Sequence, residues 1–130
     1  MAASSFTVVA DPSGRLLYLL ITGDIGMPDA PGSMRDTVVD VGLGDTTQPV
    51  IVDLRRATLA PHPDAVDILR ARVTRWATHG IPARRVAFVA TAADMRDAIA
   101  GVATLLTSRG YSSLVFEDDK AARTWAEQDA

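Results

Sequence analysis

The chain has 130 residues, of which 48% are hydrophobic and 22% are charged, with a formal net charge of −3. This composition predicts a single globular domain over residues 1–130 with a sizeable core and argues against disorder. The slight acidic excess argues against nucleic acid or an anionic membrane as a partner. The absence of cysteine excludes disulfides, thiol catalysis and thiolate metal sites. Two histidines are too few for a convincing metal site, so we expect no metal and no cofactor.

No apolar run approaches the roughly 20 residues that a membrane-spanning helix needs. The first residues, Met-Ala-Ala-Ser-Ser, lack the basic and long apolar segments of a signal peptide. We therefore expect a cytoplasmic protein of bacterial type.

The first elements predicted along the chain are two strands, Phe6–Ala10 and Arg15–Thr22, joined by Asp-Pro-Ser-Gly. Proline at the second position and glycine at the fourth favour a type I turn, so the pair is predicted to form a hairpin. The segment Gly23–Gly32 holds three glycines and two prolines, which predicts a loop. Ser33 precedes a short helical pattern over Met34–Val41, the weakest predicted helix because it contains three valines.

The rest of the chain alternates short apolar runs with helical patterns. Strands are predicted at Val50–Leu54, Val86–Ala90 and Ser113–Phe116. Helices are predicted at Asp64–His79, from Thr91 to Gly110, and after Glu117-Asp118-Asp119. The order ββαβαβαβα predicts an α/β domain with one mixed, mostly parallel sheet of five strands and about four helices. The order of the strands within the sheet stays open.

The segment that follows Leu54 is the candidate functional region, because α/β proteins bind ligands and partners at the carboxyl ends of strands. The candidate site residues are Asp53, Arg55, Arg56, Thr58, His62, Asp64 and Thr91. Each also has a structural interpretation. Asp53 can pair with Arg55, Arg56 or Arg85, His62 can be an ordinary loop residue between two prolines, and Thr91 can cap the helix that follows it.

The hairpin Phe6–Thr22, the strand Val50-Ile-Val-Asp-Leu54 and the ending Leu114–Trp125 resemble the STAS domains of the anti-anti-sigma-factor class, and more closely the SpoIIAA-like proteins. Members of that family that act as switches carry an Asp-Ser-Ser-Gly-like segment whose serine accepts phosphate. Here the matching segment is Pro61-His62-Pro63-Asp64, without a hydroxyl, and Thr58 lies earlier. The resemblance therefore implies a partner-binding surface without the phosphorylation switch. It also implies that SpoIIAA-like relatives bind apolar ligands or form dimers.

These observations predict a non-catalytic regulatory or protein-interaction module that acts through the loop and helix after the third strand. Its partner would be another protein or a second copy of the chain. The alternative is a protein that binds a small apolar molecule between the sheet and the helices Met34–Val41 and Asp64–His79. A small hydrolase is a third hypothesis, which requires His62, Asp53 or Asp24 to converge with Thr58 or Thr91.

Overall fold

The computed structural model describes the backbone of residues 5–10, 16–25, 49–59, 61, 63–78 and 85–128, and side chains within 16–25, 49–59, 61, 63–71 and 85–128. Its elements, in chain order, are β1 Ser5–Ala10, β2 Leu17–Ile25, β3 Val50–Leu59, α2 Ala65–Thr78, β4 Arg85–Val89, α3 Ala93–Ser108, β5 Ser112–Phe116 and α4 Asp119–Ala126. The predicted helix at 34–41 lies outside the described residues, so the total of four helices stays a prediction.

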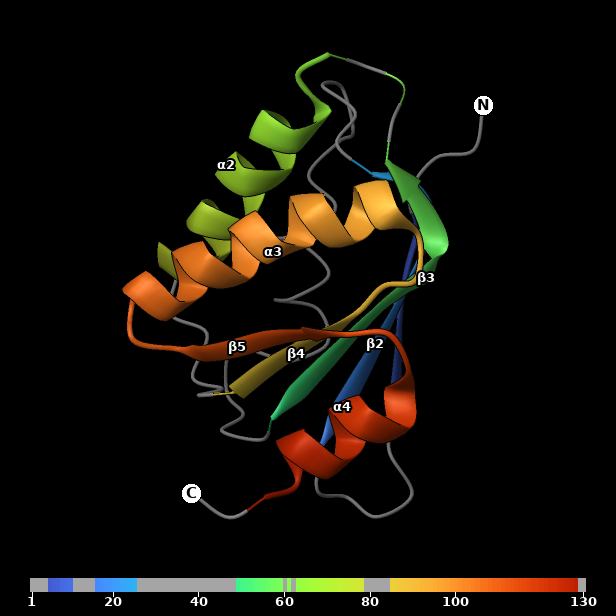
Figure 1. The fold of residues 1–130 in the computed structure, drawn as a ribbon, viewed down its shortest axis with the longest axis vertical. Helices are drawn as coiled ribbons and strands as arrows, with labels where there is room; N and C mark the ends of the chain where they lie inside the picture. Colours follow the sequence, from blue (N-terminus) through green and yellow to red (C-terminus); the bar gives the residue numbers. More distant parts are fainter. Residues whose placement is uncertain are drawn as a thin grey trace.

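The strands lie in the sheet in the order of the sequence, β1-β2-β3-β4-β5. β1 is antiparallel to β2, and β2, β3, β4 and β5 are parallel to one another. The predicted antiparallel pairing of the first two strands and the mixed α/β class with a mostly parallel sheet are therefore confirmed. The Asp-Pro-Ser-Gly turn predicted to join the two strands lies outside the described residues. Because right-handed crossovers that advance in one direction put their helices on one face, α2 and α3 lie together there. The last helix, α4, lies on the opposite face (Figure 1).

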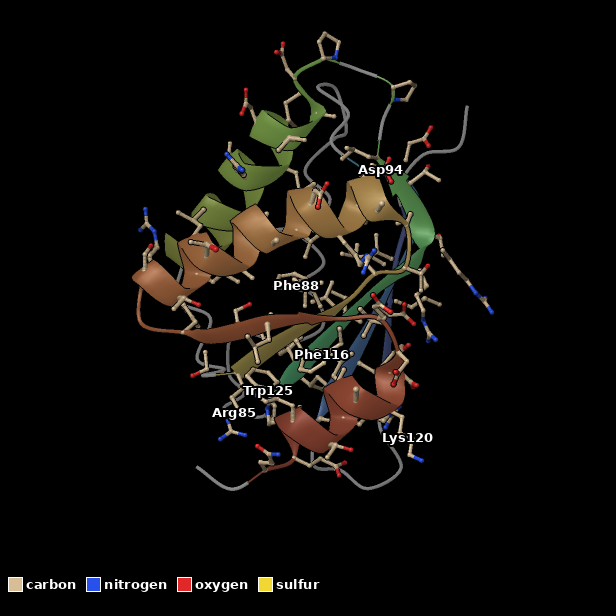
Figure 2. All side chains as sticks on the ribbon, in the orientation of Figure 1. Arg85, Phe88, Asp94, Phe116, Lys120 and Trp125 are labelled. Carbon is tan, nitrogen blue, oxygen red and sulfur yellow. The ribbon has the colours of Figure 1, made fainter. Side chains whose placement is uncertain are left out.

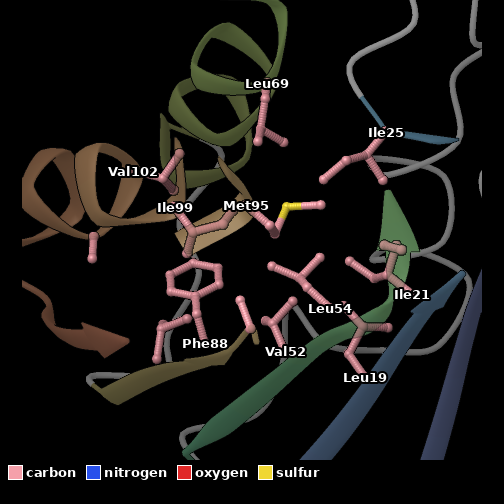
Figure 3. Packing of buried hydrophobic residues seen from close by; sticks show 14 of the residues in the cluster. Leu19, Ile21, Ile25, Val52, Leu54, Leu69, Phe88, Met95, Ile99 and Val102 are labelled. Atoms are coloured by element: carbon pink, nitrogen blue, oxygen red, sulfur yellow. The ribbon is translucent and has the colours of Figure 1, made fainter. Parts of the chain in front are cut away.

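Each face of the sheet contributes to a separate apolar core. Towards α2 and α3, residues of β2, β3 and β4 pack against Leu69, Met95, Ile99 and Val102 (Figure 3). Towards α4, a smaller cluster joins Leu16, Ile51, Ala87 and Val89 to Ala122 and Ala126. The side chains of β3 alternate between the two faces, as the period of two in a strand requires. Figure 2 shows Phe88 on the α3 side and Phe116 and Trp125 on the α4 side.

Two strands are longer than their sequence predicts. β2 continues through Gly23 and Asp24 to Ile25, where a loop was predicted, and β3 continues beyond Leu54 to Leu59. These extensions pair with each other, Gly23 with Ala57 and Ile25 with Leu59. Gly23 has φ 83°, a conformation that glycine adopts without strain and that lets the chain remain in the sheet. Pairing between two segments distant in sequence therefore overrides the turn propensity of each.

The helix α3 begins later than the sequence predicts. Its N-cap residue is Ala92, and no side chain caps the helix there, so the prediction that Thr91 caps it is wrong. The reason lies in β4, because the N–H of Ala90 still donates to the carbonyl oxygen of Phe116 at 2.9 Å. Strand pairing thus shifts the helix start past Thr91. In α4, by contrast, Asp118 is the N-cap and accepts from the N–H of Ala121 at 2.7 Å, as the acidic run indicated.

Gly101 lies where α3 faces α2, and a methyl group there would meet the guanidinium of Arg70. Arg70 is exposed, and the atoms that the methyl group would meet are at the far end of its long side chain, so a small shift of the guanidinium makes room. We therefore expect Gly101→Ala to raise the free energy of unfolding by about 0.5–1 kcal/mol, the penalty that glycine carries within a helix. Urea unfolding would measure the change, with Gly101→Ala in an Arg70→Ala background as the control. A destabilised Gly101→Ala protein would show that the Arg70 side chain is fixed against α3.

Candidate functional site

A polar cluster interrupts the apolar face of the sheet that carries α4. The carboxylate of Asp53 on β3 accepts hydrogen bonds at both oxygens. Its Oδ1 accepts from the backbone N–H and the Nε of Arg55, each at 3.0 Å. Its Oδ2 accepts from the Nη2 of Arg55 at 2.7 Å and from the hydroxyl of Tyr18 on β2. The same Nη2 also donates to the Tyr18 oxygen at 3.2 Å.

This cluster is layered, with the carboxylate inside and the guanidinium outside. The side chain of Asp53 is 4% exposed, whereas that of Arg55 is 38% exposed. A buried carboxylate is stable only when it is paired and hydrogen-bonded, and Arg55 supplies both needs. The structural interpretation, in which Asp53 pairs with Arg55, is therefore what the structure shows. The group that a partner would meet at this point is a cation.

The surroundings shift the pKa of each group in the cluster. Burial would raise the pKa of Asp53, but the hydrogen bonds from Arg55 and Tyr18 outweigh it and hold the pKa below its ordinary value. Burial, together with the hydrogen bond to Asp53, raises the pKa of Tyr18 to about 12. The hydrogen bond to Asp53 also raises the pKa of Arg55. At neutral pH the cluster therefore holds an ionised carboxylate, a neutral phenol and a guanidinium cation.

Acid should weaken the fold through Asp53. Because its pKa in the folded protein lies below the ordinary 3.8, the unfolded chain takes up the proton first as the pH falls. The stabilisation is complete above about pH 4 and is lost as the pH drops through the folded pKa. Urea unfolding between about pH 6 and about pH 3 should therefore show a steeper loss for the wild type than for Asp53→Asn. Parallel pH profiles for the two proteins would contradict this assignment.

An irregularity in the pairing of β2 and β3 places consecutive arginines on the same surface. Leu20 pairs with Asp53 but Thr22 pairs with Arg56. The chain therefore advances by two residues in β2 while it advances by three residues in β3. An extra residue of this kind is a β-bulge, which redirects side chains locally. Arg55 and Arg56 are both exposed as a result.

Beyond the bulge, Thr58 pairs with Asp24, and its hydroxyl donates to the Asp24 carboxylate. This is one of the encounters that the hydrolase hypothesis requires. A general base matched to neutral pH would have to complete it. Among the residues that the structure describes there is no imidazole, because His62 and His79 lie outside them. Within the described residues the pair is a cross-strand hydrogen bond, and the hydrolase hypothesis stays a prediction.

Helix α4 closes over the other end of the cluster. The guanidinium carbon of Arg123 lies 5.4 Å from the centre of the Tyr18 ring, a cation–π geometry. Arg123 also pairs with Asp119 one turn earlier, at 3.2 Å between Nε and Oδ2. Tyr18 is thus held between a buried carboxylate and two guanidinium groups.

The predicted site residues do not form one compact site. Asp53 and Arg55 contact each other in the middle of β3, because the strand that was predicted to end at Leu54 continues to Leu59. Arg56 and Thr58 are also strand residues. Asp64 precedes α2, where its carbonyl accepts from the N–H of Ile68 at 2.9 Å, and Thr91 is exposed after β4. His62 lies outside the described residues.

In the described part of the chain no three acidic or histidine side chains gather in a way that could hold a metal ion.

Sequence reasoning missed Tyr18 and Arg123. Tyr18 was assigned to an apolar strand, and a signal for its role did exist. A half-buried tyrosine needs a partner for its hydroxyl, and Asp53 is the charged residue within the apolar run Val50–Leu54. Arg123 carried no comparable signal, because its position over Tyr18 depends on how α4 docks.

Comparison with known proteins supports the fold. The sequence matches no family model and no curated protein. Among solved structures, the chain is similar to an uncharacterised protein of the DUF3478 family from Shewanella loihica PV-4, which has a SpoIIAA-like fold. The two share 14% identity at a TM-score of 0.64, over 97% of this chain and 95% of the other. This chain therefore has a SpoIIAA-like fold, as the resemblance implied.

No helix among the described residues is long and apolar enough to cross a membrane.

Proposed function

We propose that this chain is a non-catalytic SpoIIAA-like interaction module that binds a protein partner. Its contact surface combines the exposed side chains of β3 from Arg55 to Thr58 with Pro61, Pro63 and Asp64, which precede α2. The observation that carries the proposal is the full occupation of the Asp53 carboxylate by Arg55 and Tyr18.

That occupation argues against catalysis at the cluster. A general base must have a lone pair free for the proton that it abstracts, and both oxygens of Asp53 already accept hydrogen bonds. A phenol with a pKa of about 12 holds its proton at neutral pH. The cluster instead fixes a guanidinium at the surface, which favours recognition of carboxylate groups on a partner.

The surface also has the rigidity that recognition favours. Arg55, Arg56 and Thr58 belong to a strand paired on both sides at its start and with β2 to its end. The segment that follows exposes Pro61, Pro63 and Asp64. A partner that meets preorganised side chains loses less conformational entropy on binding.

A matched pair of substitutions tests the proposal. Thr58→Glu places a bulkier acidic side chain on the surface, and Thr104→Glu makes the same change at an exposed position of α3. The wild type and both variants would be used as baits in lysate of the source organism, with urea unfolding to confirm equal stability. We expect a specific polypeptide to be recovered with the wild type and Thr104→Glu and to be depleted about tenfold with Thr58→Glu. Equal recovery by all three baits, or no specific polypeptide with any, would contradict the proposal.

Native mass spectrometry of the purified wild type separates this function from the alternative. A small apolar molecule that stays bound at stoichiometric amount would favour the ligand-binding hypothesis. That hypothesis also involves the predicted helix at 34–41, outside the described residues. Protein free of such a ligand, together with a captured polypeptide, is the result that we expect.

A further inference from the structure

Strand β5 is an edge of the sheet that lacks the usual protection. Among the described residues it pairs with β4 alone. Natural edge strands are commonly blocked by charged residues, proline or a bulge, and the sequence Ser-Ser-Leu-Val-Phe has no charge and no proline. Leu114 at its centre is 48% exposed and is the exposed large hydrophobic side chain of the described residues. An edge of this kind is a template for another strand.

The hydrogen bonds of β5 show which groups face outward. The carbonyl of Phe116 accepts from the N–H of Ala90, so it points towards β4. Backbone groups alternate in direction along a strand, so Ser112, Leu114 and Phe116 all direct theirs towards β4. The N–H and C=O groups of Ser113 and Val115 consequently point to the open edge.

We propose that β5 pairs antiparallel with β5 of a second copy of this chain, about a two-fold axis through Leu114. In this register Ser113 exchanges two hydrogen bonds with Val115 of the second copy, and the symmetry repeats the exchange. Leu114 opposes its own counterpart in a non-hydrogen-bonded pair, where cross-strand side chains are closest. All the outward groups of the strand are then satisfied, and the exposed leucine is covered.

Charge favours a second copy in this orientation. The end of β5 leads into Glu117, Asp118 and Asp119, and Arg109 lies just before its start. Antiparallel pairing brings the acidic end of each copy towards the Arg109 end of the other, whereas parallel pairing would bring like charges together. The contact uses other residues than the partner-binding surface proposed above, so neither proposal depends on the other.

The absence of natural cysteine allows a test of the register. In a dimer of Leu114→Cys, the Cα atoms of the two introduced cysteines would lie about 4.5 Å apart, which is within the range of a disulfide. Ser112→Cys is the matched control, because it is exposed on the same strand but would lie about 13 Å from its counterpart. Under mild oxidation we expect Leu114→Cys to form a disulfide-linked dimer at least about tenfold faster than Ser112→Cys. Equal rates, or no linked dimer with Leu114→Cys, would overturn the proposal.

The wild-type protein provides a second test that needs no substitution. Sedimentation equilibrium should show a dimer whose population grows with concentration. Hydrogen exchange should show increasing protection at the amides of Ser113 and Val115 and little change at Leu114, which bonds to β4 in both states. A single monomeric species up to about 1 mM would overturn the proposal. So would a dimer that persists unchanged in Leu114→Lys.

Discussion

Replacing Asp53 with alanine is expected to lower the free energy of unfolding by about 2–3 kcal/mol. The substitution removes the acceptor for Tyr18 and Arg55 together. The phenol hydroxyl then has lost the acceptor for its proton in a half-buried position, which is costly for a donor. Arg55 is 38% exposed and can turn to water, so the loss should stay below that of a fully buried ion pair.

The two partners of Asp53 should differ in their effects. Arg55→Ala leaves a buried carboxylate with the Tyr18 hydroxyl and one backbone N–H, so we expect a loss of about 1–2 kcal/mol. Tyr18→Phe removes the hydrogen bond that the hydroxyl donates to Asp53 and the longer one that it accepts from Arg55, and it keeps the ring beneath Arg123, so the loss should be about 1 kcal/mol. Because the three groups form one network, the loss in a double variant should be less than the sum of the single losses.

Urea unfolding of these variants would measure the effects, and Asp24→Ala is the matched control. Asp24 accepts from Thr58 across the same two strands, but that contact is exposed and should contribute about 0.5 kcal/mol or less. If Asp53→Ala is no more destabilising than Asp24→Ala, the hydrogen bonds of the Asp53 cluster do not stabilise the fold as its geometry indicates.

The sequence predicted the fold class because its apolar periods are strong. The runs at Val50–Leu54 and Val86–Ala90 and the stripe Met95, Ile99, Val102, Leu106 are buried as expected. The predicted lengths of two strands, β2 and β3, were wrong because both strands continue beyond their predicted ends. Gly23 and Asp24 are typical of turns, and Arg55-Arg56 breaks the apolar alternation, so each segment by itself indicates a loop. Only the pairing between them keeps both in the sheet, and pairing between distant segments leaves no local signal.

The same limit explains how much of the candidate site could be predicted. The contact between Asp53 and Arg55 lies within three residues and was among the interpretations that the sequence offered. Tyr18 lies 35 positions from Asp53, and its partner depends on the register of β2 against β3. The bulge that turns Arg55 and Arg56 to one surface depends on that register too. Residues near each other in sequence could therefore be matched, and those brought together by the sheet could not.

Replacing Trp125 with alanine is the other substitution for which we expect a large effect, a loss of about 2–4 kcal/mol in the free energy of unfolding. The Trp125 ring lies 5.7 Å from the Phe116 ring, centre to centre, and Arg85 lies 5.6 Å from the Trp125 ring centre (Figure 2). The loss combines these contacts with the cavity left beneath α4.

Trp125→Ala should reduce the local stability of α4 more than that of the sheet. A helix of eight residues is too short to be stable in isolation, so α4 depends on its docking. Ala122 and Ala126 are fully buried but small, which leaves Trp125 as the large apolar contact of the described helix. We therefore expect the amides of α4 in Trp125→Ala to lose hydrogen-exchange protection before those of β3 and β4.

Two comparisons isolate the role of the Trp125 ring. Lys120→Ala changes an exposed residue of the same helix and should alter stability by less than about 0.5 kcal/mol. Arg85→Ala removes the cation over the ring and the hydrogen bond from Nη1 to the Trp125 carbonyl at 2.8 Å, so its loss should be intermediate, about 1–2 kcal/mol. If Trp125→Ala lowers the free energy of unfolding no more than Arg85→Ala does, the hydrogen bond from the Arg85 side chain to the Trp125 carbonyl holds α4 in place and the Trp125 ring does not. In that case the small alanine contacts would be sufficient to cover Leu16 and Ile51.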